Sequence, residues 1–125
     1  MAKILVAVED FEVRERITAA TSAKGHEVIE GDDGQEVVEL VSSTLPDLVL
    51  VDAMMPVFNG YEVCEMLRND ITVDNALPII IVTGSDGDPR MRDRVGATEF
   101  LAKNHEVHQL RDLLVEQLGP KANPR

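Results

Sequence analysis

Residues 47–52 read Asp-Leu-Val-Leu-Val-Asp, and this stretch decides the fold that the sequence predicts. Four consecutive apolar residues lie between two aspartates, and Pro46 breaks the chain before them. A short apolar run bounded in this way is typical of a strand that is covered on both faces, as in a parallel sheet between layers of helices. We therefore expect a buried strand over 47–52 that ends in a carboxylate, Asp52.

The same pattern occurs five times along the chain. Strands are predicted over 4–8, 27–30, 47–52, 78–83 and 98–102, with the polar second strand near an edge. Amphipathic stretches follow each strand, and caps are predicted at Asp33, Asn59 and Asp88, with a stop at Gly96. The last two helices are predicted as a short one after Pro89 and a longer one over about 105–118. Five strand–helix units predict an α/β fold with a doubly wound, five-stranded parallel sheet.

The length and composition of the chain predict a single domain. The chain has 125 residues, of which 44% are apolar, so it can bury a core without disulfide or metal support. We expect the domain over residues 1–119 and a tail or linker stub over 120–125. A single cysteine, Cys64, excludes an internal disulfide framework and favours a reducing compartment. With no leader sequence and no apolar run of about 18 residues, the expected location is the cytoplasm and not the membrane.

The net charge of the chain excludes one class of partner. Twelve Lys and Arg against 23 Asp and Glu give a net charge of −11. Such a chain repels phosphate backbones, so direct binding of nucleic acid is not expected. The three histidines, His26, His105 and His108, show no metal-ligand spacing and are expected on the surface, whereas Cys64 is expected to be packed.

Polar side chains occur where the predicted strands end. The first strand ends in Glu9-Asp10, the third in Asp52, the fourth in Thr83-Gly84-Ser85, and Lys103 follows the fifth. The carboxyl ends of parallel strands meet at one edge of the sheet, which is where such sheets bind ligands. Three carboxylates brought together repel one another and require a cation, and oxygen ligands suit Mg²⁺. Metal, hydroxyl, ammonium and an oxygen nucleophile are the groups that phosphoryl transfer uses.

With these residues in this order, the sequence resembles the receiver domain of two-component response regulators. The resemblance covers nearly the whole chain and depends on four pieces: residues 3–6 before Glu9-Asp10, residues 52–56 with Gly60, residues 81–83, and residues 96–98 before Phe100 and Lys103. It implies a flavodoxin-like receiver fold with strand order 2-1-3-4-5.

The resemblance also implies a role for each site residue. Asp52 would be the phosphoacceptor. Mg²⁺ would be bound by Asp10, Asp52 and the backbone carbonyl of Met54, with Glu9 acting through a metal-bound water. Thr83 and Lys103 would contact phosphoryl oxygens, and Phe100 would be an aromatic switch that moves with Thr83.

A switch of this kind implies particular partners. It would receive its phosphoryl group from a histidine kinase or a phosphotransfer protein and pass the signal to a downstream protein or to a missing effector domain. It would be a signalling domain and not an enzyme, catalysing only its own phosphoryl transfer and slow dephosphorylation.

The sequence departs from the family pattern in two places. Receivers usually follow the lysine with proline, often in the cis form, whereas here Asn104 follows Lys103. A cis bond before a residue other than proline costs about 2.5–4 kcal/mol, so we expect a trans bond or a strained cis bond held by the site. The stretch from Thr83 to Phe100 is also shorter than usual, which predicts a short fourth helix and an altered output surface.

Two other functions remain open on the sequence. One is a receiver-like interaction module that is never phosphorylated, which Asn104 and the short fourth helix would suit. The other is a Mg²⁺-dependent aspartyl phosphohydrolase, which commonly needs a second acid two residues after the nucleophile. Met54 occupies that position and cannot transfer a proton.

Overall fold

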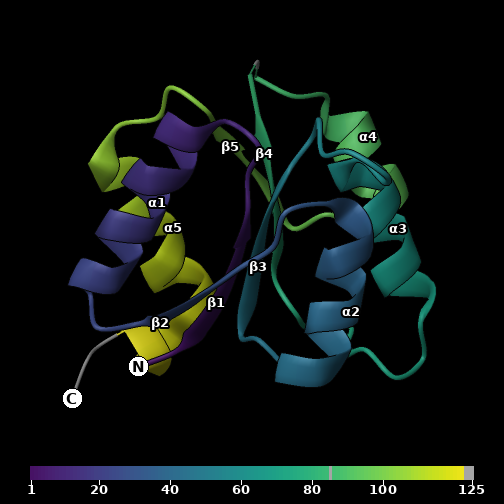
Figure 1. The fold of residues 1–125 in the computed structure, drawn as a ribbon, viewed down its shortest axis with the longest axis horizontal. Coiled ribbons are helices and arrows are strands. Elements are labelled where there is room, and N and C mark those ends of the chain that lie inside the picture. Colours follow the sequence, from purple (N-terminus) through teal and green to yellow (C-terminus); the bar gives the residue numbers. More distant parts are fainter. Residues whose placement is uncertain (85, 123–125) are drawn as a thin grey trace.

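The computed structural model describes residues 1–84 and 86–122, with side chains described as far as Pro120. Its strands are β1 (Lys3–Ala7), β2 (Glu27–Glu30), β3 (Leu48–Asp52), β4 (Ile79–Thr83) and β5 (Glu99–Ala102). Its α-helices are α1 (Phe11–Ala23), α2 (Gly34–Thr44), α3 (Gly60–Asn69), α4 (Pro89–Val95) and α5 (Val107–Leu118). All strand pairs are parallel and the sheet order is β2-β1-β3-β4-β5 (Figure 1). The predicted doubly wound sheet and its strand order are confirmed.

Helices cover both faces of the sheet, α1 and α5 on one side and α2, α3 and α4 on the other (Figure 1). Neighbouring residues of each inner strand enter opposite cores. Leu48 and Leu50 pack under α1 and α5, while Val49 and Val51 pack under α2 and α3. This two-sided burial explains the continuous apolar run that ends at Asp52.

The helix ends follow the predicted caps. The Asp33 carboxylate accepts the Glu36 N–H, and Asn59 and Glu62 form a reciprocal capping box at the start of α3. The fourth helix is short, as predicted: it has seven residues, starts with Pro89 after Asp88, and ends at Gly96 in the left-handed conformation.

The chain ends differ slightly from the expectation. Helix α5 begins at Val107, two residues later than predicted, and a 3₁₀-helix over Gly119–Ala122 follows it. Ser85 lies outside the described residues, as do residues 123–125, which belong to the predicted tail. Among the described helices, none is long and apolar enough to cross a membrane.

The prediction that all three histidines lie on the surface is wrong for two of them. The side chains of His26 and His105 are each 5% exposed, and only His108 is exposed. His26 is buried because its Nδ1 accepts the Ala2 N–H at 3.0 Å where β1 and β2 begin. His105 folds back over its own turn, with Nδ1 2.7 Å from the Ala102 carbonyl oxygen. Sequence spacing gave no sign of either contact.

Candidate functional site

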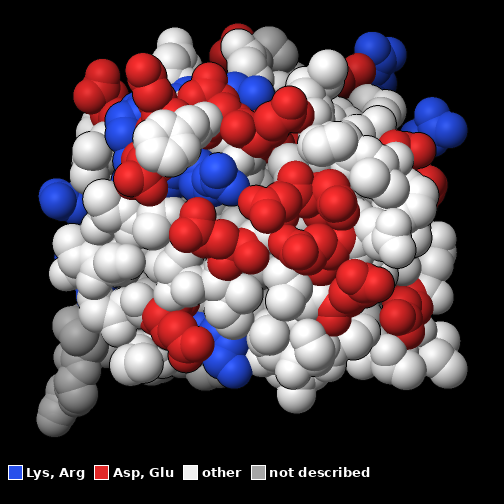
Figure 2. Space-filling view, in the orientation of Figure 1, with Lys and Arg blue, Asp and Glu red and all other residues white. Residues whose placement is uncertain are grey.

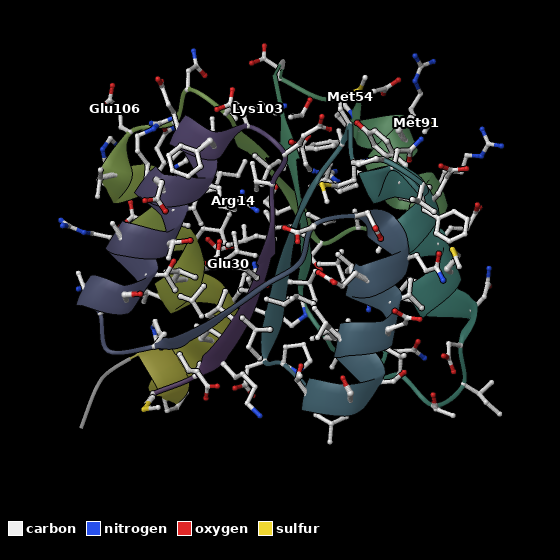
Figure 3. All side chains as sticks on the ribbon, viewed as in Figure 1. Arg14, Glu30, Met54, Met91, Lys103 and Glu106 are labelled. Atoms are coloured by element: carbon white, nitrogen blue, oxygen red, sulfur yellow. The ribbon has the colours of Figure 1, made fainter. Side chains whose placement is uncertain are left out.

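A pocket of about 490 Å³ opens at the carboxyl ends of the strands. It is lined by Glu9 and Asp10 after β1, Asp52 and Met54 at the end of β3, and Lys103 after β5. Figure 3 shows Met54 and Lys103 at this edge of the sheet. The structure therefore brings together residues from three segments that lie far apart in the sequence.

Asp52, the last residue of β3, is fully buried at the base of this pocket. Its Oδ1 accepts the Met54 N–H at 2.9 Å, and its Oδ2 accepts the Glu9 N–H at 3.1 Å. A buried carboxylate needs such donors, because water no longer solvates it. The two backbone donors fix the orientation of the Asp52 carboxyl group.

Lys103 supplies the positive charge beside Asp52. Its Nζ lies 3.2 Å from Asp52 Oδ1, and its side chain is 26% exposed, so the ammonium group sits between the buried carboxylate and solvent. The Lys103 N–H donates to the Thr83 carbonyl oxygen at 2.8 Å, which continues the β4–β5 pairing to the pocket. The trans bond to Asn104 thus leaves Lys103 directed at Asp52.

Asp10 and Glu9 lie at the rim of the pocket. Asp10 also caps α1, because its Oδ1 accepts the Val13 N–H at 3.2 Å. Glu9 is exposed and contacts Asp52 through its backbone rather than its carboxylate. One oxygen of Asp10 is therefore engaged in the helix cap while the residue lines the pocket.

These donors fit a Mg²⁺ ion in their chemistry. In the present side-chain arrangement, no three Asp, Glu, His or Cys residues of the described chain are grouped to hold one ion. Mg²⁺ does not need three, since it usually takes one or two carboxylates and completes its shell with waters and a phosphate oxygen. Asp10 and Asp52, which both line the pocket, supply that number of carboxylates.

Neither Thr83 nor Phe100 lines the pocket. Thr83 ends β4, one residue beyond Val82, which pairs with Asp52 across the sheet. Phe100 is half-buried on the side of α3 and α4, in an edge-to-face contact with Tyr61 at a ring-centroid distance of 6.4 Å. Gly87 lies over the same ring, since a Cβ there would come within 2.7 Å of it.

Acidic side chains gather on the face shown in Figure 2. One basic residue, Arg14 of α1, pairs with Glu30 at 3.6 Å and with Asp32 at 3.2 Å. Figure 3 shows Arg14 and Glu30 next to each other between α1 and the sheet. The negative charge on this face is thus partly balanced by Arg14.

Sequence reasoning missed the groups that orient the site. The Glu9 and Met54 backbone N–H groups have no signature in the sequence, because every residue except proline carries one. Arg16 of α1 was missed as well, although its guanidinium donates to the Lys103 and His105 carbonyl oxygens. It is 87 residues from Lys103 in the chain, and nothing in its neighbourhood distinguishes it from a solvated surface arginine.

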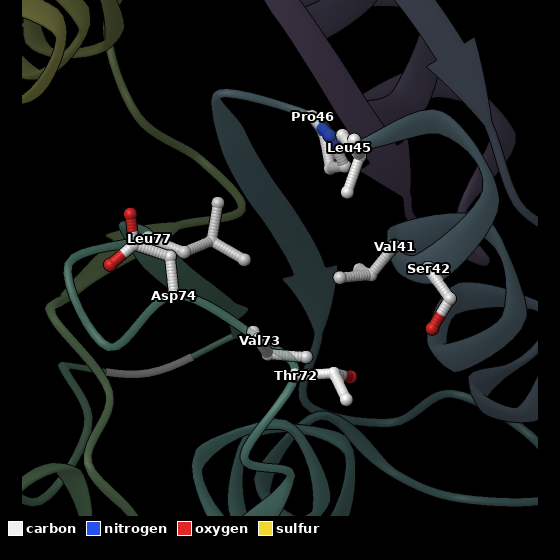
Figure 4. A pocket seen from close by; sticks show the side chains of 8 residues that line it. All are labelled: Val41, Ser42, Leu45, Pro46, Thr72, Val73, Asp74 and Leu77. Atoms are coloured by element: carbon white, nitrogen blue, oxygen red, sulfur yellow. The ribbon is translucent and has the colours of Figure 1, made fainter.

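Another cavity of about 490 Å³ lies at the opposite end of the sheet, where β3 and β4 begin (Figure 4). Its lining is mainly apolar and consists of Val41, Ser42, Leu45, Pro46, Thr72, Val73, Asp74 and Leu77. Its lining includes one carboxylate, that of Asp74, and no Lys, Arg or His, so it lacks the positively charged groups that phosphoryl transfer uses.

Comparison with known proteins matches this sequence to response regulators. The family model described as the response regulator receiver domain matches residues 4–115. A response regulator MprA from Mycolicibacterium vanbaalenii is 37% identical over 113 residues, and the MprA of Mycobacterium ulcerans is 36% identical over the same length. Each match covers 86% of this chain and 46% of the relative, so the chain spans about half the length of these proteins.

Solved structures show the same fold. The chemotaxis response regulator CheY4 of Vibrio cholerae superposes with a TM-score of 0.86 at 26% identity, covering 94% of this chain and 99% of that one. The signal receiver domain of a signal transduction histidine kinase from Syntrophus aciditrophicus gives 0.82 at 26% identity, covering 94% and 90%.

Proposed function

The chain belongs to the response regulator receiver domain family, and on that premise we propose that Asp52 accepts a phosphoryl group from a partner phosphohistidine. Receiver domains act in two-component signalling as phosphorylation-dependent switches rather than as classical enzymes. The donor would be a histidine kinase or a phosphotransfer protein. We expect the reaction to take place in the cytoplasm, because free cysteines such as Cys64 are stable in that reducing compartment.

The observation that carries this proposal is the environment of Asp52. It is a buried carboxylate at the base of an acidic pocket, held by two backbone N–H groups and 3.2 Å from the Lys103 ammonium. A carboxylate placed in this way is oriented as a nucleophile before the donor arrives, which removes part of the entropic cost of the reaction.

In the proposed transfer, an Asp52 carboxylate oxygen attacks the phosphorus atom of the phosphohistidine. A P–O bond forms and the P–N bond breaks, with its electron pair staying on the imidazole nitrogen, which takes up a proton. Lys103 would shift from the Asp52 carboxylate to a phosphoryl oxygen, and the Thr83 hydroxyl would donate to another. These donors neutralise charge on the equatorial oxygens of the transition state.

Asp10, Asp52, the Met54 carbonyl and, through a water, Glu9 would hold Mg²⁺ in this site. The ion would supply positive charge next to the transferred phosphoryl group. The carboxylates therefore bind the cation that offsets their own repulsion of the incoming phosphate.

The signal would leave the site through Thr83 and Phe100. Movement of Thr83 toward the phosphoryl group would free space that the half-buried Phe100 ring enters, and the faces formed by α4, β5 and α5 would change. A downstream protein or an effector domain in the same polypeptide would read this change. Direct binding of nucleic acid by these residues is not expected, given the net charge of −11.

The test is labelling by a small phosphodonor. Incubation with acetyl phosphate and Mg²⁺ should add one phosphoryl group per chain, and Asp52→Asn or chelation of the metal should abolish the labelling. Asp112→Asn, an exposed acid on α5, is the matched control and should label like wild type. No labelling of the wild type would favour the unphosphorylated interaction module. Sustained release of phosphate over many turnovers would favour the phosphohydrolase.

A further inference from the structure

We propose that Arg16 is a positioning residue that holds Lys103 against Asp52 by clamping the loop between β5 and α5. This inference rests on the proposed function, since it assigns Arg16 to the same phosphoryl transfer. Arg16 lies on α1, and Figure 1 shows the β5–α5 connection passing beside the first turns of that helix.

The guanidinium group of Arg16 makes two hydrogen bonds to the loop backbone. Its Nη2 donates to the Lys103 carbonyl oxygen, and its Nη1 donates to the His105 carbonyl oxygen at 3.3 Å. The two acceptors stand on either side of Asn104. One rigid, planar donor group therefore spans the segment that follows Lys103 directly.

His105 also fixes the turn between β5 and α5, through contacts with Ala102 inside the turn itself. The His105 N–H donates to the Ala102 carbonyl oxygen at 3.1 Å, and the His105 ring Nδ1 lies 2.7 Å from the same oxygen. The His105 side chain is buried, whereas Asn104 is exposed. The turn is thus anchored inside by His105 and outside by Arg16.

The loop needs such an anchor because its own sequence does not restrict it. The Lys103–Asn104 bond is trans, and Asn104 has no ring to fix its backbone as a proline would. The Lys103 side chain is long, so holding it by its ammonium group alone costs much side-chain conformational entropy. By fixing the Lys103 carbonyl, Arg16 fixes the backbone from which Nζ reaches Asp52.

Arg16 does not touch the reacting atoms, so its effect must pass through Lys103. The experiment is a double-mutant cycle with Arg16→Met and Lys103→Met, following the rate of Asp52 labelling by acetyl phosphate at saturating Mg²⁺. Arg16→Met should slow labelling about tenfold, since a displacement of about 1 Å at a positioned group can cost on the order of a hundredfold. The double variant should label no more slowly than Lys103→Met alone.

Arg16→Lys provides the graded variant, because a lysine keeps the charge but not the planar fork, and its rate should fall between those of wild type and Arg16→Met. Arg111→Met, an exposed arginine on α5, removes the same charge away from the loop and should label like wild type. If Arg16→Met lowers the folded fraction, Arg16→Lys and Arg16→Gln replace it in the same cycle.

The outcomes separate this inference from the proposed function. Wild-type rates for Arg16→Met, or rate losses that multiply in the double variant, overturn the role of Arg16 while labelling of Asp52 stands. Failure of wild type to label at Asp52 overturns the proposed function itself, before any Arg16 variant is made.

Discussion

At the scale of single residues, the buried polar side chains are the informative ones. Asp52 is fully buried and satisfied by two N–H groups and an ammonium. His26 is nearly as buried, but only its Nδ1 has a hydrogen-bond partner, and its Nε2 has none among the described residues. Because Nδ1 accepts the Ala2 N–H, the ring is neutral with its proton on Nε2. Protonation of Nδ1 would set two donors against each other.

This arrangement predicts a pH dependence of stability. Burial, followed by the N-terminal ammonium and Lys24, lowers the pKa of His26 below its usual value near 6.5, with Asp47 opposing. The folded chain therefore binds the proton less tightly than the unfolded chain. Stability is complete above the unfolded pKa and falls as the pH drops through about 6.5 toward the folded pKa.

His26→Asn keeps an acceptor where Nδ1 stood but cannot be protonated, so it should reduce the loss of unfolding free energy between pH 7 and pH 5. Urea denaturation at both pH values measures it. His108→Asn, at an exposed position, is the control. Burial also lowers the pKa of His105, so part of the loss should remain in His26→Asn. If His26→Asn leaves the pH dependence of stability unchanged, His26 is not the group whose protonation destabilises the fold.

At the scale of elements, the start of α3 is pressed against the end of β3. Asn59 and Glu62 cap the helix, and Gly60 follows as its first residue. A Cβ at position 60 would lie 2.6 Å from the Asp52 carbonyl oxygen, which only the absence of a side chain allows. The start of α3 and the end of β3 at Asp52 therefore hold each other in place through backbone contact.

Gly60→Ala should accordingly cost about 1–3 kcal/mol of stability, the usual range for overpacking, and should slow labelling of Asp52. Urea denaturation gives the first effect and acetyl phosphate labelling the second. Gly84→Ala is the control for stability, because a Cβ placed there would meet no described residue within 4 Å apart from its neighbours in the chain. Equal stability of the two variants would show that β3 and α3 can move apart without cost.

At the scale of the whole molecule, the acidic balance of the chain, a net charge of −11, is also felt in one pocket, where Glu9, Asp10 and Asp52 lie beside a single lysine. A cation bound only by the folded acid cluster stabilises the entire fold by mass action. We expect Mg²⁺ to raise the melting temperature, with a gain of about 2.7 kcal/mol at 100 times its dissociation constant.

Asp10→Asn should abolish most of that gain, because it removes a ligand charge while asparagine still caps α1. Differential scanning calorimetry with and without Mg²⁺ measures the effect, and Asp112→Asn should keep the full gain. A Mg²⁺ response that Asp10→Asn leaves intact would place the ion elsewhere.

The short α4 carries a further prediction about assembly. It has seven residues, as the short stretch from Thr83 to Phe100 predicts, so it offers little surface to a partner. We expect the phosphorylated domain not to form a tight symmetric dimer through α4. Sedimentation of the labelled protein tests this, and a tight dimer that Arg90→Glu dissociates would contradict it.

Four features could be predicted from the amino-acid sequence alone: the sheet, its buried strands, the helix caps and the polar residues at the strand ends. These depend on hydrophobic periodicity and on contacts between residues three or four apart, which are local and therefore readable along the chain. The apolar run that ends at Asp52 is the clearest case.

The surroundings of those residues could be known only once the chain was folded. The Glu9 N–H on Asp52, the hydrogen bonds from Arg16 to the Lys103 loop and the contact of His26 with Ala2 depend on how distant segments come together. The contact of His105 with Ala102 is local, but its spacing has no signature in the sequence. A backbone N–H has no residue identity, and an arginine on a helix surface looks the same whether it faces water or a carbonyl oxygen. The orientation of the site therefore came from packing, while its composition came from the sequence.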